Sequence, residues 1–408
     1  MKQVVMLGML LLLASCGKFL EEEPSGSLSL THYYKTAEQV SAAVNGTYDG
    51  LAAPFVVNIG VAVSPVYSLE YITGYCRRPR PSGFEDDQFL RLDHLDNANS
   101  RLQGWWNATY YPVENCNSVI ENVSVTSLVD ELTKQRYLGE ACFLRAWYYF
   151  QAVRLFGDIP LKLSATKDIN DVRIRRSPKE AVYEQVVKDL KTAENAGLPW
   201  ADQSGHVSLG AVKSLLAKVY ITMAGYPLQK GKPYYQLAYD KAMEVIGSHQ
   251  FSLFEQYGDL RNPAVQNTRE HIFMLQRHPT VAVSNIHWAY LPYPARPISI
   301  QPAYGGAMVP AKAFYDSYAD DDARKQEQAF FYTKYARYGN PAETVFFPEP
   351  YIFKFWDEEA EKTGRSGANF PLIRYADVLL LCAEAKSMID GGATSDAAAI
   401  DAYYLVHH

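Results

Sequence analysis

Apolar residues recur at intervals of three and four along much of this chain, the spacing of one face of an α-helix. This spacing predicts helices over residues 36–51, 97–125, 130–156, 208–224 and 233–248, and another from Pro371 to about Met388. Thr36 is the expected N-terminal cap of the first of these helices, because its hydroxyl can accept a bond from a free backbone N–H.

The segment 130–156 carries two apolar stripes, which predicts a helix buried between neighbours. Gly157 should end this helix, and Pro160 prevents it from continuing. Another helix should open at Ser177-Pro178-Lys179-Glu180, which has a capping-box pattern. Successive helices of this kind resemble a tetratricopeptide-like stack of helix pairs, although no strict repeat period aligns them.

Two long stretches, residues 53–95 and 251–367, lack helical spacing and are rich in proline and glycine. These residues interrupt regular structure, and irregular segments of this length are usually functional. The predicted fold is therefore mostly α, with one helical domain over residues 36–408 that carries two large irregular insertions.

The N-terminus has the pattern of a secretory signal: Lys2, an apolar run over residues 4–13, and then Leu13-Ala14-Ser15-Cys16. The run is too short for the ~20 residues of a membrane-spanning helix. A cysteine in this position is the acceptor of bacterial lipoproteins, so residues 1–16 are predicted to end in a lipidated Cys16. The alternative is an ordinary signal peptide with an incidental cysteine.

Residues 17–35 are expected to form a tether between the lipid and the folded body. The acidic triplet of residues 21–23 fits either a solvated linker or a surface-export signal. We therefore expect a protein anchored to a membrane that it does not cross.

The amino-acid composition argues against some classes of function. The 408 residues are 48% hydrophobic, and 39 Lys and Arg against 45 Asp and Glu leave a net charge of −6. A mildly acidic chain without basic clusters argues against nucleic acid as a partner. The 30 tyrosines suit both helix packing and a binding surface made of rings. Cys76, Cys116, Cys142 and Cys382 are widely spaced, which favours buried free thiols.

Catalytic and cofactor motifs are absent from the sequence, so no cofactor and no catalytic residue is predicted. The acidic runs 85–87 and 320–322 could hold Ca²⁺ with help from loop carbonyls, but solvated charge runs are the better interpretation. Asp322 and Arg324 are expected to form a structural ion pair. The sequence does not decide whether two carboxylates are placed for glycoside hydrolysis, because that depends on the distance between them in the folded protein.

Several blocks in the same order resemble the SusD/RagB family of outer-membrane nutrient-uptake lipoproteins. They are the Cys16 lipobox with its acidic tether, Trp105-Trp106…Tyr110…Asn115…Ile120, GEACFLRA over residues 139–146 running into Tyr148-Tyr149, FGDIPL over 156–161, AVKSLLAKVY over 211–220, and FPLIRYADVLLLCAEA over 370–385. The resemblance covers nearly the whole chain.

This resemblance implies a right-handed superhelix of helix pairs, with a glycan site on one face and a SusC-like TonB-dependent transporter bound at another. It also implies a closing C-terminal segment, which this sequence lacks after Tyr403-Tyr404; a truncated or frame-shifted chain is the expectation.

A glycan site needs exposed rings for the apolar faces of sugars and polar groups for their hydroxyls. The two insertions supply both, and we expect the ligand to contact Tyr71 and Tyr75 of the first and Trp288, Tyr290, Tyr293 and Arg296 of the second. Trp105 and Trp106 match a helix-packing position of the family and are assigned to the core.

The sequence thus favours a non-enzymatic, surface-exposed lipoprotein of the outer membrane that captures oligosaccharide or polysaccharide and delivers it to a SusC-like transporter. The alternatives are a lipoprotein glycoside hydrolase and a peptide-binding or scaffold solenoid.

Overall fold

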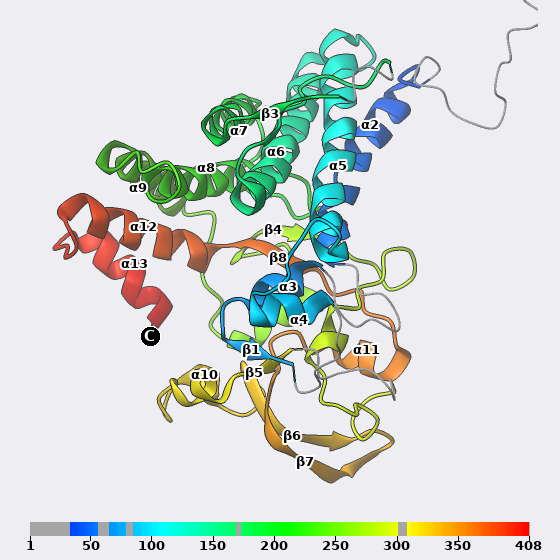
Figure 1. The fold of residues 1–408 in the computed structure, drawn as a ribbon, viewed down its shortest axis with the longest axis vertical. Helices are drawn as coiled ribbons and strands as arrows, with labels where there is room; N and C mark the ends of the chain where they lie inside the picture. Colours follow the sequence, from blue (N-terminus) through cyan, green and yellow to red (C-terminus); the bar gives the residue numbers. More distant parts are fainter. Residues whose placement is uncertain (1–32, 56–64, 79–84, 169–172, 301–307, 408) are drawn as a thin grey trace, which may run out of the picture.

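The structure, a computed structural model, describes residues 33–55, 65–78, 85–168, 173–300 and 308–407. The predicted lipidated Cys16 and most of the tether lie outside these residues. Helices form a stack at one end of the molecule, and the two insertions form the other end (Figure 1).

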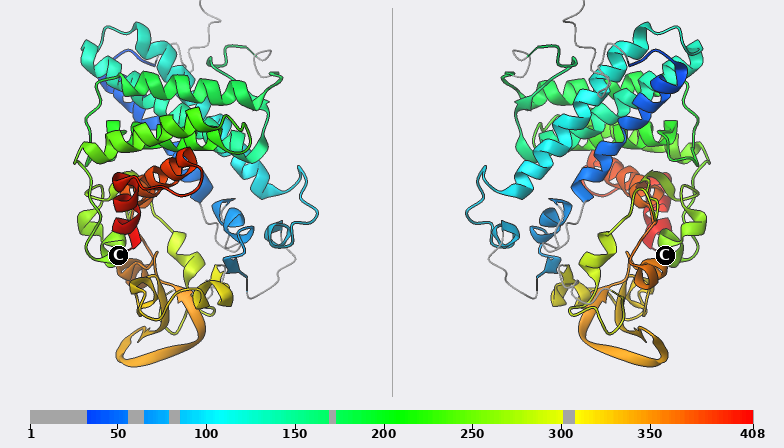
Figure 2. Two further views of the ribbon diagram at one scale, coloured as in Figure 1. Left: turned by 90° about the vertical axis from the view of Figure 1, so that its left-hand side faces the viewer. Right: turned by 90° about the vertical axis from the view of Figure 1, so that its right-hand side faces the viewer.

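The stack contains α2 (Ala37–Gly46), α5 (Ser100–Val125), α6 (Glu131–Phe156), α7 (Lys179–Glu194), α8 (Leu209–Ala224), α9 (Lys232–Gly247), α12 (Tyr375–Asp390) and α13 (Ala397–His407). From α5 to α9, each helix packs against the next, and α12 packs on α9 and α13 on α12. This is the predicted tetratricopeptide-like arrangement, and all views show it (Figures 1 and 2).

Local signals set most of the helix ends. Thr36 and Ser208 cap α2 and α8 by accepting bonds from backbone N–H groups three residues later, at 3.2 and 3.1 Å. Gly157 ends α6 with a φ of 70°, which a glycine adopts without strain. The predicted capping box at Ser177 is wrong: Pro178 precedes α7, and the N–H of Lys179 donates to the Asp158 carboxylate at 2.8 Å.

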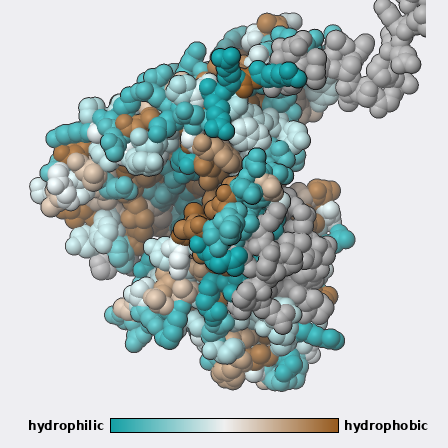
Figure 3. All heavy atoms as spheres, viewed as in Figure 1, coloured by the Kyte–Doolittle hydropathy of each residue, from teal (hydrophilic) through white to brown (hydrophobic). Residues whose placement is uncertain are grey.

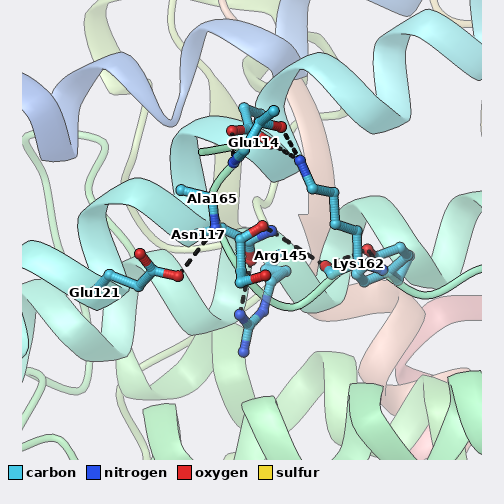
Figure 4. Close-up of polar contacts among 9 residues, drawn as sticks. Glu114, Asn117, Glu121, Arg145, Lys162 and Ala165 are labelled. Atoms are coloured by element: carbon cyan, nitrogen blue, oxygen red, sulfur yellow. Dashed lines mark hydrogen bonds and ion pairs between the residues drawn. The ribbon is translucent and has the colours of Figure 1, made fainter. Parts of the chain in front are cut away.

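Helix α6 is buried on two sides, as predicted, and carries a charged group in its interior. The Arg145 guanidinium donates to both oxygens of Asp189 on α7, at 2.8 and 2.7 Å, and to Asn117 on α5, at 2.8 Å. Asn117 in turn donates to the carbonyl of Lys162, and the ammonium of Lys162 binds Glu114 (Figure 4). Three helices and the loop after α6 are thereby connected through one polar network.

The first insertion holds the end of η3 (Asp49–Phe55), α3 (Pro65–Tyr71), β1 (Cys76–Arg77) and α4 (Glu85–Arg91). The second holds η5 (Tyr257–Arg261), η6 (Pro263–Val265), β4 (His271–Leu275), η7 (Ile286–Tyr290), β5 (Val309–Pro310), α10 (Lys312–Asp316), η8 (Ala323–Lys325), β6 (Phe331–Arg337), β7 (Asn340–Ile352) and α11 (Glu358–Thr363). Between α6 and α7, β2 (Ile159–Pro160) pairs with β3 (Arg176–Ser177).

The prediction of an irregular second insertion is wrong for the hairpin of β6 and β7, which projects from the end opposite the helical stack (Figures 1 and 2). Pro341, Pro348 and Pro350 suggested a broken chain, but all three lie within β7. In the part of the chain that the structure describes, this sheet consists of two strands, so β7 has a free edge where a missing N–H does no harm.

The helix predicted from Pro371 begins four residues later, at Tyr375. Residues Phe370–Arg374 form β8 instead, which pairs antiparallel with the fully buried β4. Tertiary pairing therefore overrides the local helical spacing here.

The four remaining cysteines in the described residues are free and buried, as expected. Trp105 is buried, whereas Trp106 is 37% exposed beside Tyr110 and Phe156, so its assignment to the core is wrong. Asp322 and Arg324 form the expected ion pair at 2.6 Å. Within the same residues, no helix combines the length and apolar character needed to cross a bilayer.

Candidate functional site

The two insertions, which residues 96–250 separate in the sequence, meet at a short antiparallel pairing. Cys76 and Arg77 of β1 lie opposite Pro310 and Val309 of β5. The N–H of Ala311 also donates to the carbonyl of Tyr75, at 2.7 Å. The two predicted binding segments therefore form one surface.

A cavity of about 190 Å³ lies beside this pairing. Residues from both insertions and from β8 line it, among them Glu70, Tyr75, Tyr290, Phe314, Lys354, Phe355 and Phe370. Its lining is mostly aromatic with two charged groups, a composition typical of ligand sites.

The rings of this cavity support one another. Tyr75 packs on Phe314 with ring centres 4.8 Å apart, and Tyr290 packs on Phe355 at 4.5 Å. Phe355 is stacked on Phe370 of β8 at 5.4 Å with an interplanar angle of 13°. Because Tyr75 is 56% exposed, it offers a free ring face at the mouth, whereas Tyr290 is 7% exposed and belongs to the inner lining.

The pKa values of the two charged groups in the cavity, Lys354 and Glu70, are shifted. Burial, together with the nearby Arg374 charge, lowers the pKa of Lys354 to about 8. Burial raises the pKa of Glu70, and the charge of Lys354 opposes that rise. The ammonium of Lys354 lies 5.2 Å from the ring centre of Phe355, so a cation stands among the aromatic rings.

A second cavity, of about 410 Å³, lies on the other side of Glu70 and Phe370, between these residues and the helices α5, α6 and α8. Trp105, Trp147 and Arg154 line its helical side. Hydrophobic side chains gather along the waist between the helical stack and the insertions in the space-filling view (Figure 3). The two cavities thus follow the boundary between the halves of the molecule.

Of the predicted contact residues, the structure brings Tyr75 and Tyr290 together in the cavity. Tyr293 and Arg296 are exposed but do not line it. Cys16 lies outside the described residues.

The expectation of surface rings is wrong for Tyr71 and Trp288, which are 3% and 8% exposed. Trp288 belongs to η7, where all five residues are buried. Met308, farther along the chain, lies against this turn, and its N–H donates to the carbonyl of Ala289 at 2.8 Å. Both rings belong to the main hydrophobic core, which hides them from solvent.

Sequence reasoning missed Glu70, Lys354 and Phe355. A signal for Lys354 was present, because it is the one charge in the run Phe353-Lys354-Phe355-Trp356.

The acidic run 320–322 forms ion pairs: Lys325 binds Asp320 at 2.8 Å, and Arg324 binds Asp322. No group of three potential metal-ligating side chains occurs in the part of the chain that the structure describes.

A stack of helix pairs with a ring-lined cavity between two long insertions is the architecture of a solenoid-type binding protein. Residues 80–221 match a SusD-like family model described as starch-binding and associating with the outer membrane. Residues 273–407 match the model of the SusD family itself.

Similar proteins agree with these matches. A solved SusD superfamily protein from Parabacteroides distasonis is 31% identical, with a TM-score of 0.84 over 92% of this chain and 79% of its own. The SusD-like protein P2 of Formosa agariphila is 25% identical over 96% of this chain and 78% of its own length. Surface glycan-binding protein A from Bacteroides uniformis shares the fold, with a TM-score of 0.72 at 18% identity over 91% of this chain and 80% of its own. The chain belongs to the SusD/RagB family.

Proposed function

We propose that this protein is a lipid-anchored, non-enzymatic glycan-binding protein that captures oligosaccharide or polysaccharide at the outer face of the outer membrane and delivers it to a SusC-like TonB-dependent transporter. Membership of a family described as starch-binding and outer-membrane-associated supports the proposal. A relative of the same fold is named as a surface glycan-binding protein. Copurification of a TonB-dependent transporter with this chain from membranes tests the delivery step.

The observation that carries the glycan site is the cavity where the two insertions meet. Its volume of about 190 Å³ is below the roughly 300–1,000 Å³ of pockets for drug-sized ligands, so it suits one sugar residue with the rest of the glycan outside. Tyr75 stands at the mouth with an exposed ring, where the apolar face of a second sugar residue can stack. Tyr293 and Arg296 are exposed and extend the proposed contact surface.

The energetics require more than one ring. A stack that buries ~100 Å² of apolar surface contributes ~2.5 kcal/mol at ~25 cal/mol per Å². A millimolar complex needs ~4 kcal/mol before ordering costs. Tyr75 together with the inner rings and the two charged groups reaches that range.

The test is a glycan array followed by titration with the glycans that bind. We expect Tyr75→Ala to weaken binding roughly tenfold, about 1.4 kcal/mol, because one exposed stacking face is lost. Phe346→Ala is the matched control: Phe346 is a 74% exposed ring on β7 that does not line the cavity. Equal affinities of Tyr75→Ala and wild type would place the site elsewhere, and release of reducing sugar by the purified protein would favour a hydrolase.

A further inference from the structure

The cavity contains a lysine, Lys354, whose surroundings differ from those of several other partly buried lysines of the described structure. Lys162 pairs with Glu114 at 2.6 Å, and Lys213 and Lys241 pair with Glu194 at 2.6 and 2.7 Å. For Lys354, no carboxylate lies within ion-pair distance among the residues placed by the structure. Its ammonium instead lies 6.0 and 5.2 Å from the ring centres of Phe330 and Phe355.

The nearby carboxylates do not serve as a counter-ion for Lys354. Glu270 is bound to Arg374 at 3.0 Å and also accepts from the N–H of Phe254. Glu70 lines the same cavity as Lys354 and interacts with it only at longer range. A buried ammonium without a counter-ion is costly, and a ligand that brings one gains that energy on binding.

We propose that this cavity takes a sugar that carries an anionic substituent, a carboxylate or a sulfate, with the ammonium of Lys354 as its counter-ion. The inference rests on the proposed glycan-binding function and specifies its ligand class. The inner rings of Tyr290 and Phe355 pack against the sugar, and Lys354, which borders the cavity from the end of the β6–β7 hairpin, donates to the anionic oxygens.

Glu70 has the opposite effect to Lys354 on the binding of an anionic sugar. Its carboxylate lies across the same cavity and repels an anion, while it can accept bonds from sugar hydroxyls. Removal of its charge should therefore strengthen binding of an anionic sugar, whereas removal of the Lys354 charge should weaken it. This opposition separates a charge effect from a loss of shape.

Binding should also depend on pH. The lowered pKa of Lys354, about 8, means that the ammonium is lost on moderate alkalinisation, and a bound anion raises that pKa again. The charged and titratable groups around Lys354 come from α3, β8, the segment before β4, η5 and η7; they are Glu70, Arg374, Glu270, Arg261 and His287. Among them, burial lowers the pKa of His287 to about 4, so its imidazole is neutral over the pH range of the experiment.

The experiment uses two sets of three sugars that differ only at C6: glucose, glucuronate and glucose 6-sulfate, and galactose, galacturonate and galactose 6-sulfate. A glycan array with neutral, uronate and sulfated glycans precedes the titrations. We expect an acidic member to bind at least tenfold more tightly than its neutral counterpart at pH 7, and the preference to fall severalfold at pH 9.5. Which acidic member binds decides between carboxylate and sulfate.

Lys354→Met keeps the length of the side chain and should abolish the preference for the acidic sugar over its neutral counterpart. Glu70→Gln should increase affinity for the acidic sugar severalfold. Lys312→Met, at an exposed lysine that does not line the cavity, is the control and should change nothing. The pH dependence of the wild type tests the same point if Lys354→Met fails to fold.

Two failures are distinguishable. If neutral glycans bind and acidic ones show no advantage at pH 7, the inference about Lys354 is overturned and the glycan-binding function stands. If no glycan on the array binds, the proposed function fails and the inference fails with it.

Discussion

Glu361 and His287 are buried together in the second insertion, with His287 Nε2 and Glu361 Oε1 3.7 Å apart. Their exposed fractions are 6% and 3% for the two side chains. Burial raises the pKa of Glu361 to about 7, with a further rise from the Asp357 charge and an opposing hydrogen bond from Ser299. Burial lowers the pKa of His287 to about 4. Burial therefore favours the uncharged form of both groups.

This pair predicts a pH-dependent stability. A carboxyl whose pKa is raised in the folded state stabilises that state while protonated and loses this contribution as pH rises from about 4.5 to about 7. Glu361→Gln should therefore be more stable than wild type by roughly 2–3 kcal/mol at pH 8, with little difference below pH 4.5. Urea unfolding at several pH values measures this.

Glu359→Gln on the same helix is the control, because Glu359 is exposed and its substitution should leave the pH profile unchanged. Parallel profiles of wild type and Glu361→Gln between pH 4.5 and 8 would contradict the prediction. His287 has the opposite pH dependence. Because its pKa is lowered in the folded state, the folded state loses stability as pH falls from 6.5 towards 4, both in wild type and in Glu361→Gln.

At the scale of elements, the interface of α5, α6 and α7 depends on Arg145. Arg145→Met leaves Asp189, which is 3% exposed, without its bidentate partner. We expect a loss of roughly 3–5 kcal/mol in unfolding free energy, because an unpaired charge then stays buried.

The double variant Arg145→Met/Asp189→Leu should recover much of that loss, because it removes the charge together with its partner. Denaturant unfolding of the two variants measures the difference. A double variant as unstable as the single one would show that Asn117 and its bonds to the Lys162 and Ser164 carbonyls matter more than the ion pair.

Sequence reasoning succeeded where structure is determined locally. The helices follow from apolar spacing and from caps such as Thr36 and Ser208, which act within one turn. It failed where a distant partner decides: β8 is a strand because β4 lies beside it, and the prolines of β7 are tolerated at a free edge.

In the candidate site, too, the sequence predicted the features that are determined locally and missed those that depend on a distant partner. The loop position of Tyr75 predicted an exposed ring, and the structure agrees at 56% exposure. The cavity itself depends on the pairing of β1 with β5, and no spacing along the chain indicates that Glu70 and Lys354 face the same cavity. Burial of Trp288 was likewise invisible, because Trp288 belongs to a core cluster whose members come from segments far apart in the sequence.

At the scale of the whole molecule, the position of the N-terminal end shows where a lipid anchor on Cys16 would attach. The described chain begins next to α2 in the helical stack, and the β6–β7 hairpin lies at the far end (Figures 1 and 2). Between Cys16 and residue 33 lie residues 17–32, which is 32 − 16 = 16 residues. Fully extended, they span about 50–60 Å at ~3.3–3.6 Å each. A lipid on Cys16 would thus be attached to the helical end of the molecule through a segment of at most this length.

This arrangement depends on the thiol of Cys16, which gives the last prediction. Cys16→Ala should move the protein from the membrane fraction to the soluble fraction and abolish incorporation of labelled fatty acid, because the acylated atom is gone. Cys382→Ala is the control: Cys382 is a buried thiol 3.6 Å from the sulfur of Met243, so its loss should leave fractionation and labelling unchanged. Labelling that persists in Cys16→Ala, or a wild-type protein without label, would contradict a lipid anchor at this position.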